Sequence, residues 1–269
     1  MFRRLLALAA APFLIAWLLP LETWQPLDPE NTLVIETTKG RIVVEMRPEF
    51  APLAVQRVKL LAREKVYDGL QFHRVIEGFV AQTGNPNNED GGVSAHPDLP
   101  PEFQFRLPPA GPQTVAVRRS DGIEGFVGST PFAGVSEKET ARAPDGLVRG
   151  WGAYCAGVVG MGRQADPGSA NSEIFFMREA ARRLDHEYTV WGRVVQGLDV
   201  VRAIKVGEPP ADPDRMVRVR VAADLPPAER PRVEVAAQGE HFEAQLAMLR
   251  RLKGADFTVC DVNVPVRTR

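Results

Sequence analysis

Cysteine and aromatic residues are scarce in this sequence of 269 residues. Only Cys155 and Cys260 occur, and aromatic residues make up 7% of the chain. Two cysteines outside a Cys-x-x-Cys pair are too few for a thiolate zinc site, and the spacing of the four histidines matches no zinc template. We therefore expect no metal and no cofactor. In an oxidising compartment the cysteines would pair as a disulfide; two separate buried thiols are the alternative.

The sequence also lacks an excess of charge of either sign and has no internal repeat. Its 33 basic and 34 acidic residues give a formal net charge of −1. Such a balance produces no field that would gather nucleic acid, so no nucleic-acid partner is expected. The 23 glycines and 23 prolines favour short strands joined by many turns over a helical bundle. No pattern demands a partner subunit, which leaves the oligomeric state open.

One long hydrophobic run is present, at the N-terminus. Arg3 and Arg4 precede a nearly continuous apolar stretch over residues 5–21, which is the order of a secretory signal. At about 17 residues the stretch is also close to the lower limit for a membrane span. Residues 1–24 are therefore interpreted as a cleaved signal peptide or an uncleaved membrane anchor, followed by a linker over residues 25–31. Both interpretations place the rest of the chain in the periplasm or another extracytoplasmic space, whereas a buried helix of a cytoplasmic protein is a third alternative.

The middle of the chain reads as many short strands with two helices. Apolar alternation on both sides of Lys39-Gly40 predicts a hairpin over residues 32–45. Pro52 opens a stretch with helical periodicity that ends near residues 67–69, and a second helix is expected over residues 198–204. Further strands are expected at residues 71–75, 79–82, 114–117, 157–161, 174–177, 189–194 and 216–221. This order favours an antiparallel barrel or sandwich.

The main domain is placed at residues 32–225. It contains one insertion and is followed by a C-terminal extension. Residues 118–152 are rich in Gly, Ser, Pro and charge and are interpreted as a long inserted loop. A C-terminal extension over residues 226–269 reads as a strand (232–236), a helix (240–253) and a strand (257–264).

The most informative motif begins at Phe72 and reads Phe-His-Arg-Val-Ile-x-x-Phe-x-x-Gln-x-Gly. It resembles the signature of the cyclophilins, a family of peptidyl-prolyl cis-trans isomerases. Three later blocks, Gly157 to Gly162, Asn171 to Phe176 and Leu184 to Val194, resemble the remaining blocks of that family in the same order. The resemblance covers roughly residues 32–221.

The resemblance implies a mainly β fold, a closed eight-stranded antiparallel barrel capped by two helices, and isomerisation of X-Pro bonds in exported polypeptides during folding. It assigns Arg74 and Gln82 to catalysis, Arg74 facing the prolyl nitrogen and Gln82 the substrate backbone. His73, on the opposite face of the strand from Arg74, is expected to be structural. By the same register Phe175 faces the pocket. The substrate-binding positions would be Phe79, Val80, Gly162, Arg163, Glu173, Phe175, Leu184 and Tyr188.

Several residues depart from the family pattern. Val80 stands where Met is usual, Gly162-Arg163 where Ala-Asn is common, and Glu173 where Gln is common. The Glu173 carboxylate would either pair with Arg74 and weaken it or help to orient it. Arg183 stands where some eukaryotic members carry a Trp that contacts cyclosporin, so we expect weak inhibition by that drug.

Two other functions remain as alternatives. One is a non-catalytic chaperone or scaffold with a cyclophilin fold that binds proline-containing segments. The other is a hydrolase, for which the sequence shows neither a carboxylate pair nor a His pattern beside Ser172.

Overall fold

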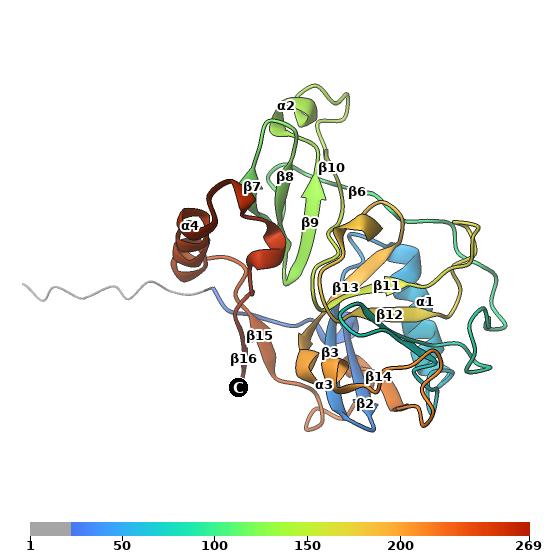
Figure 1. The fold of residues 1–269 in the computed structure, drawn as a ribbon. Coiled ribbons are helices and arrows are strands. Elements are labelled where there is room, and N and C mark those ends of the chain that lie inside the picture. The colour runs from blue at the N-terminus through green and yellow to red at the C-terminus, as the bar shows by residue number, and fades with distance from the viewer. Residues whose placement is uncertain (1–22) are drawn as a thin grey trace, which may run out of the picture.

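The structure, a computed structural model, describes residues 23–269, and this part of the chain is mainly β (Figure 1). It contains three antiparallel sheets of eight, five and three strands. Within the same residues there are four α-helices. The N-terminal segment interpreted as a signal or anchor lies, up to residue 22, outside the described residues. Among residues 23–269 no helix combines the length and the apolar character needed to cross a membrane.

The eight-stranded sheet positions the site and has the order β14-β2-β3-β13-β11-β12-β5-β4. It curls until segments beside its two edges meet: Phe72 N donates to Asp214 O (2.9 Å), and Val75 N donates to Gly207 O (2.8 Å). The mainly β fold with a curled eight-stranded antiparallel sheet that the sequence predicts is thus confirmed. The strands are β2 (Thr32–Thr37), β3 (Gly40–Met46), β4 (Arg74–Val75), β5 (Val80–Thr83), β11 (Val158–Met161), β12 (Ile174–Met177), β13 (Val190–Gln196) and β14 (Met216–Val221).

The two predicted helices of the main domain are present as α1 (Pro52–Arg63) and α3 (Leu198–Ala203). Pro52 begins α1, where its missing N–H costs no helical hydrogen bond. The first turn of α1 is capped from outside, because the Glu102 carboxylate accepts from the amides of Leu53 (3.0 Å) and Ala54 (2.9 Å). The helix is amphipathic and packs its apolar face on the sheet through Ala54, Val55, Val58, Leu61 and Ala62.

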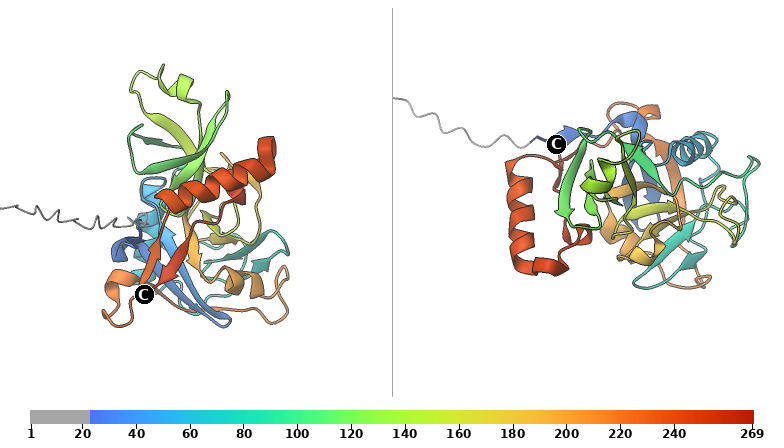
Figure 2. Two further views of the ribbon diagram at one scale, coloured as in Figure 1. Left: turned by 90° about the vertical axis from the view of Figure 1, so that its left-hand side faces the viewer. Right: turned by 90° about the horizontal axis from the view of Figure 1, so that it is seen from above.

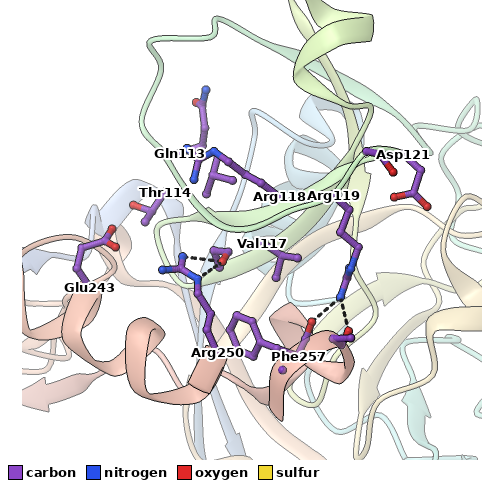
Figure 3. Close-up of a pocket in the computed structure, with 14 residues that line it drawn as sticks. Gln113, Thr114, Val117, Arg118, Arg119, Asp121, Glu243, Arg250 and Phe257 are labelled. Atoms are coloured by element: carbon purple, nitrogen blue, oxygen red, sulfur yellow. Dashed lines mark hydrogen bonds between the residues drawn. The ribbon is translucent and has the colours of Figure 1, made fainter. Parts of the chain in front are cut away.

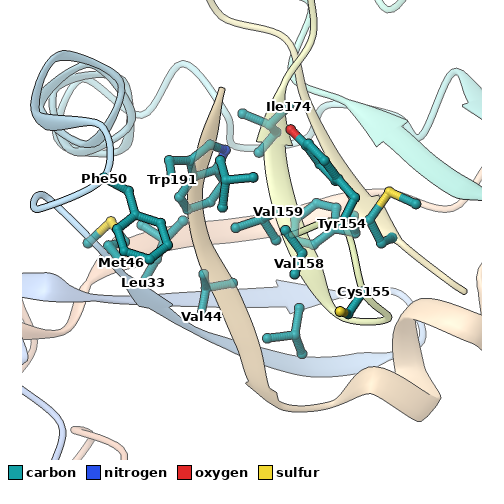
Figure 4. Close-up of a cluster of buried hydrophobic side chains, with 14 of the residues drawn as sticks. Leu33, Val44, Met46, Phe50, Tyr154, Cys155, Val158, Val159, Ile174 and Trp191 are labelled. Carbon is teal, nitrogen blue, oxygen red and sulfur yellow. The ribbon is translucent and has the colours of Figure 1, made fainter. Parts of the chain in front are cut away.

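The core lies between the sheet and α1 and reaches the strands that carry the site (Figure 4). Trp191 on β13 and Met46 on β3 are almost fully buried. Tyr154, also fully buried, stacks on Phe175 of β12 with ring centroids 5.7 Å apart. The core therefore supports the back of the pocket described below.

The prediction of a loop over residues 118–152 is wrong, because most of that segment is folded into a second sheet. The sheet has the order β6-β10-β9-β8-β7 and stands beside the eight-stranded sheet (Figure 1). Some of its glycines serve close contacts inside strands: a Cβ on Gly150 would lie 2.8 Å from the Phe105 ring, and one on Gly125 would collide with Thr114 O. Its elements are β6 (Phe105–Leu107), β7 (Gln113–Arg118), β8 (Ile123–Val127), β9 (Thr130–Gly134), α2 (Glu137–Thr140) and β10 (Val148–Gly152).

The C-terminal extension packs against this second sheet (Figure 2). Phe242 of α4 (Glu240–Lys253) packs edge-on against Phe126 of β8, with centroids 5.7 Å apart. The predicted strand over residues 257–264 is wrong, since 3-10 helices occupy Gly254–Asp256 and Val259–Asp261. The third sheet, β1-β15-β16, joins both ends of the described chain and consists of β1 (Gln25–Pro26), β15 (Val233–Val235) and β16 (Val266–Thr268).

In the structure Cys155 and Cys260 form a disulfide bond across a sequence separation of 105 residues. Cys155 lies just before β11 and Cys260 in the 3-10 helix Val259–Asp261. The bond therefore joins the extension to the main domain. The segment interpreted as a linker, residues 25–31, contains β1 and the 3-10 helix Pro29–Asn31.

Candidate active site

A cavity of about 330 Å³ opens on the outer face of the eight-stranded sheet. All ten catalytic and substrate-binding residues assigned from the sequence line it, together with Asp90, which the sequence did not single out. The ten are Arg74, Phe79, Val80, Gln82, Gly162, Arg163, Glu173, Phe175, Leu184 and Tyr188.

The strand register brings the central residues into one row. Arg74 on β4 lies opposite Gln82 on β5, and Gln82 lies opposite Phe175 on β12. Side chains at directly opposite positions of neighbouring strands project from the same face of a sheet. A cation, an amide and an aromatic ring therefore stand side by side on the face that carries the cavity.

Arg74 is held at the edge of the cavity with its side chain one third exposed. Its Nη1 donates to Gln82 Oε1 at 3.0 Å, and its Nε donates to Glu208 Oε2 at 2.8 Å. Within residues 23–269, its third nitrogen, Nη2, has no hydrogen-bond partner. One N–H edge of the guanidinium is thus free to meet a bound molecule.

Glu173 acts on Arg74 through Gln82 and not by a direct ion pair among the described residues. Gln82 Nε2 donates to Glu173 Oε1, and Asn85 Nδ2 donates to Glu173 Oε2 at 2.5 Å. Because the amide NH2 of Gln82 is engaged by the carboxylate, its oxygen must face Arg74. Of the two roles considered from the sequence, the orienting one fits this geometry.

Gly162 makes room for the Glu173 side chain. A Cβ placed on Gly162 would lie only 2.6 Å from Glu173 Cγ, well inside van der Waals contact. The Gly162 amide also donates to Glu173 O at 2.8 Å, so the two backbones are fixed to one another. Gly162 therefore leaves the space that the Glu173 side chain occupies in this structure.

The other side of the cavity is apolar and contains Phe79, Val80, Leu184 and the buried ring of Phe175. Tyr188 meets Phe175 edge-on with centroids 5.7 Å apart, and forms the rim. Such a pocket can hold a small saturated ring and exclude water from the groups around it.

Tyr154, which stacks on Phe175, is itself held by a hydrogen bond to Asp185. The amide of Tyr154 donates to Asp185 Oδ1 at 2.9 Å. Burial raises the pKa of the Asp185 carboxyl, although Arg182 and the Tyr154 amide oppose the shift. Burial also raises the pKa of the Tyr154 hydroxyl, so that residue is neutral.

Two arginines cover aromatic rings at the rim. The Arg163 guanidinium lies 4.5 Å from the centroid of Tyr188, and its Nε donates to Glu187 O at 3.1 Å. The Arg183 guanidinium lies 4.5 Å from the centroid of Phe79. These cation-π contacts place two positive charges beside the aromatic rings of the cavity.

Sequence reasoning missed Asp90, Asn85 and Glu208. Asn85 directly follows the first motif, and this adjacency was the one signal that pointed to it. Asp90 lies in a polar loop, and Glu208 is 134 residues from Arg74 in sequence. No local pattern marks either residue. Glu208 reaches the site through the closure of the sheet, whereas Asp90 lies in the loop after β5, which pairs with β4 and β12.

A second and larger hollow, of about 890 Å³, lies between β7 and α4 (Figure 3). Two of its arginines are engaged by backbone oxygens: Arg250 donates twice to Ala116 O (2.9 and 2.6 Å), and Arg119 donates to Phe257 O at 2.5 Å. The third, Arg118, pairs with Glu137. None of the residues assigned to catalysis lines it. Arg119 and Arg250 link β7 to the extension, and the smaller cavity is the candidate active site.

The chain is similar to known proteins over most of its length. Residues 32–221 match the family described as cyclophilin type peptidyl-prolyl cis-trans isomerase. A protein of Brucella suis named probable peptidyl-prolyl cis-trans isomerase is 34% identical over 234 residues, covering 81% of this chain and 96% of its own length. The crystal structure of cyclophilin AquaCyp293 from Hirschia baltica superposes with a TM-score of 0.82 at 34% identity, covering 92% of this chain and 94% of that one.

Proposed function

The chain belongs to the family of cyclophilin-type peptidyl-prolyl cis-trans isomerases, and we propose that it assists the folding of exported polypeptides by accelerating rotation about their X-Pro bonds. The activity is that of the family. The roles of single residues, the export and the folding role are our proposals and rest on the arguments below.

Rotation about an X-Pro bond must break amide resonance, against a barrier of about 18 to 20 kcal/mol. No nucleophile is needed for this step. We assign Arg74 to the prolyl nitrogen, where a donated hydrogen bond from the unpartnered Nη2 favours a pyramidal, non-conjugated nitrogen. Such an interaction is stronger in the transition state than in the planar ground state, which is the condition for catalysis.

The remaining residues hold the substrate on both sides of the rotating bond. Phe79, Phe175 and Leu184 would grip the pyrrolidine ring so that the preceding carbonyl turns against a fixed ring. Gln82 keeps Arg74 in place and lies within reach of a substrate backbone. The observation that carries the proposal is this Arg74-Gln82-Glu173 chain beside an apolar pocket of ring size.

Export is proposed from two features. Arg3 and Arg4 precede the apolar stretch over residues 5–21, and Cys155 is joined to Cys260. Disulfides persist mainly outside the reducing cytosol. Fractionation of cells that express the full chain should recover it outside the cytoplasm, and deletion of residues 1–24 should retain it inside. Recovery of the full chain in the cytoplasm would refute the export.

The catalytic assignment is tested by a protease-coupled assay on a short peptide that contains Ala-Pro. Arg74→Ala should lower kcat/KM by about 100-fold, the usual loss for one transition-state donor. The matched control is Arg142→Ala, since Arg142 is exposed in the turn between α2 and β10 and does not line the cavity. A folded parent no faster than the uncatalysed peptide would favour the non-catalytic chaperone or scaffold instead.

A further inference from the structure

Three side chains that can bind a metal meet at one end of the catalytic cavity. They are His73, Asp90 and Glu173, and their nearest ligand atoms all lie within 4.8 Å of one another. They come from three separate segments: His73 directly precedes β4, Asp90 lies in the loop after β5, and Glu173 directly precedes β12. Asp90 and Glu173 also line the cavity.

The His73 ring is the observation that points to a ligand. His73 is only 4% exposed, and within residues 23–269 neither of its ring nitrogens has a hydrogen-bond partner. A buried polar group without a partner is costly and uncommon in proteins. The Nε2 atom lies 3.6 Å from Glu173 Oε2, beyond hydrogen-bond distance but directed at the carboxylate.

The spacing suits a small tetrahedral ion. Zinc binds histidine nitrogen and carboxylate oxygen at about 2.0 to 2.2 Å, so two of its ligand atoms stand about 3.3 Å apart. The observed 3.6 Å between His73 and Glu173 is close to that separation. Asp90 is exposed, so its carboxylate can move the remaining distance without disturbing the core.

We propose that His73, Asp90 and Glu173 form a binding site for Zn²⁺. A nitrogen ligand with two carboxylates suits Zn²⁺, whereas Mg²⁺ and Ca²⁺ prefer oxygen ligands alone. Three protein ligands leave a fourth position, which opens on the cavity through Asp90 and Glu173. Histidine and cysteine spacing in the sequence predicted no metal. The proposed ligands escape such a search because they are one histidine and two carboxylates, with Glu173 far from the other two in sequence.

The ion would also act on the isomerase, a consequence that rests on the proposed function. Glu173 holds Gln82 through Oε1 and Asn85 through Oε2. A zinc ion would take up at least one of these oxygens and occupy the cavity end next to Arg74. Zn²⁺ should therefore inhibit the full-length protein reversibly, with activity restored by EDTA.

The test is a competition titration of Zn²⁺ between the full-length protein and a chromophoric chelator, which does not depend on activity. Loss of an outer-shell partner typically costs about 10- to 100-fold in metal affinity, so Asp90→Asn and His73→Gln should each weaken Zn²⁺ binding at least about tenfold. Asp121→Asn and His96→Gln are the matched controls. Asp121 lines the other hollow and His96 is paired with Glu64, so both lie outside the cluster.

The outcomes are separable. A saturable site that Asp90→Asn weakens and Asp121→Asn does not would support the proposal, even if His73→Gln fails to fold. No saturable Zn²⁺ binding, or binding that both cluster variants leave unchanged, would overturn it. Isomerase activity in EDTA reports independently on the proposed function, so failure of the metal site leaves that function intact.

Discussion

At the scale of single residues, Gly162 and Glu173 depart together from the residues common in the family, and the structure places them in contact. Glu173 is buried, and its carboxylate is used by Gln82 and Asn85. An alanine at position 162 would crowd its Cγ. Where the family commonly has Ala and Gln, this chain has Gly and Glu. Gln and Glu are nearly equal in size, so position 173 changes in charge, while Gly162 leaves room for its side chain.

Glu173 is a positioning residue, which a pair of variants can test. Glu173→Ala removes the acceptor that holds the Gln82 amide, so Arg74 loses its fixed orientation and kcat should fall about tenfold with little change in KM. Glu173→Gln keeps an acceptor oxygen and should stay close to the parent. The assay is run in metal-free buffer to separate this effect from any bound ion. Equal losses in both variants would contradict the positioning role.

Arg183 should govern the response to cyclosporin. Its guanidinium covers the Phe79 ring at 4.5 Å, where some eukaryotic relatives present a Trp. A charged group at this contact must be desolvated by an apolar ligand, so we expect inhibition weaker than micromolar, and tighter inhibition of Arg183→Trp. A drug titration of the isomerase assay measures both, and submicromolar inhibition of the parent would show that the expectation is wrong.

At the scale of elements, the turn after α1 is tied to β14 by one carboxylate. Asp68 Oδ1 accepts from Val219 N (2.9 Å) and Arg220 Nη1 (2.8 Å), and Oδ2 accepts from Arg220 Nη2 (2.8 Å). Burial opposes ionisation of Asp68, but the hydrogen bonds from Arg220 and Val219 outweigh it and lower the pKa of the carboxyl. The contact fixes the end of α1 against the last strand of the sheet.

Asp68→Asn should therefore destabilise the fold in a pH-dependent way. Because the folded-state pKa lies below the unfolded value, the stabilisation is present above about pH 4 and is lost as the pH falls through the folded-state pKa. At pH 7 the variant should lose about 1 to 2 kcal/mol of unfolding free energy. Urea unfolding of parent and variant should show this gap at pH 7 and a smaller one near pH 3. A gap that does not change with pH would exclude the ionised pair as its cause.

At the scale of the whole molecule, the C-terminal extension joins parts that are distant in sequence. Phe242 packs on Phe126 of the second sheet, and β15 pairs with β1 near the start of the described chain. The disulfide adds a covalent link between residues 155 and 260. The extension therefore links the second sheet, the start of the described chain and the region before β11.

Removal of the Cys155–Cys260 disulfide should lower the stability of the folded chain. A closed loop of about 100 residues restricts the unfolded chain, and loss of such a disulfide typically costs about 2 to 4 kcal/mol. The denaturant midpoint of the parent should fall on reduction, whereas reductant should leave the midpoint of Cys155→Ala/Cys260→Ala unchanged. A thiol assay without reductant that finds two free thiols in the native protein would contradict the bond.

The sequence by itself determined most strands and both helices of the eight-stranded-sheet region, and its resemblance to the cyclophilins indicated ten residues that share one cavity. The prediction of β12 at residues 174–177 and of β14 at residues 216–221 agrees with the structure, because local apolar patterns and turn residues act over short distances. The first motif placed Arg74 and Gln82 eight residues apart, and a tight turn between β4 and β5 brings them opposite each other.

Only the tertiary structure decided the contacts made across the fold. The glycines of residues 118–152 indicated a loop, because glycine gives the backbone conformational freedom. In strands, however, a glycine such as Gly125 or Gly150 leaves space for a neighbouring strand to approach closely. Glu208 meets Arg74 because the sheet curls until distant segments adjoin. Asp90 meets His73 and Glu173 because these residues flank β5, β4 and β12, which are neighbours in the sheet. Local sequence specifies which groups are present, but their partners depend on closure of the chain in three dimensions.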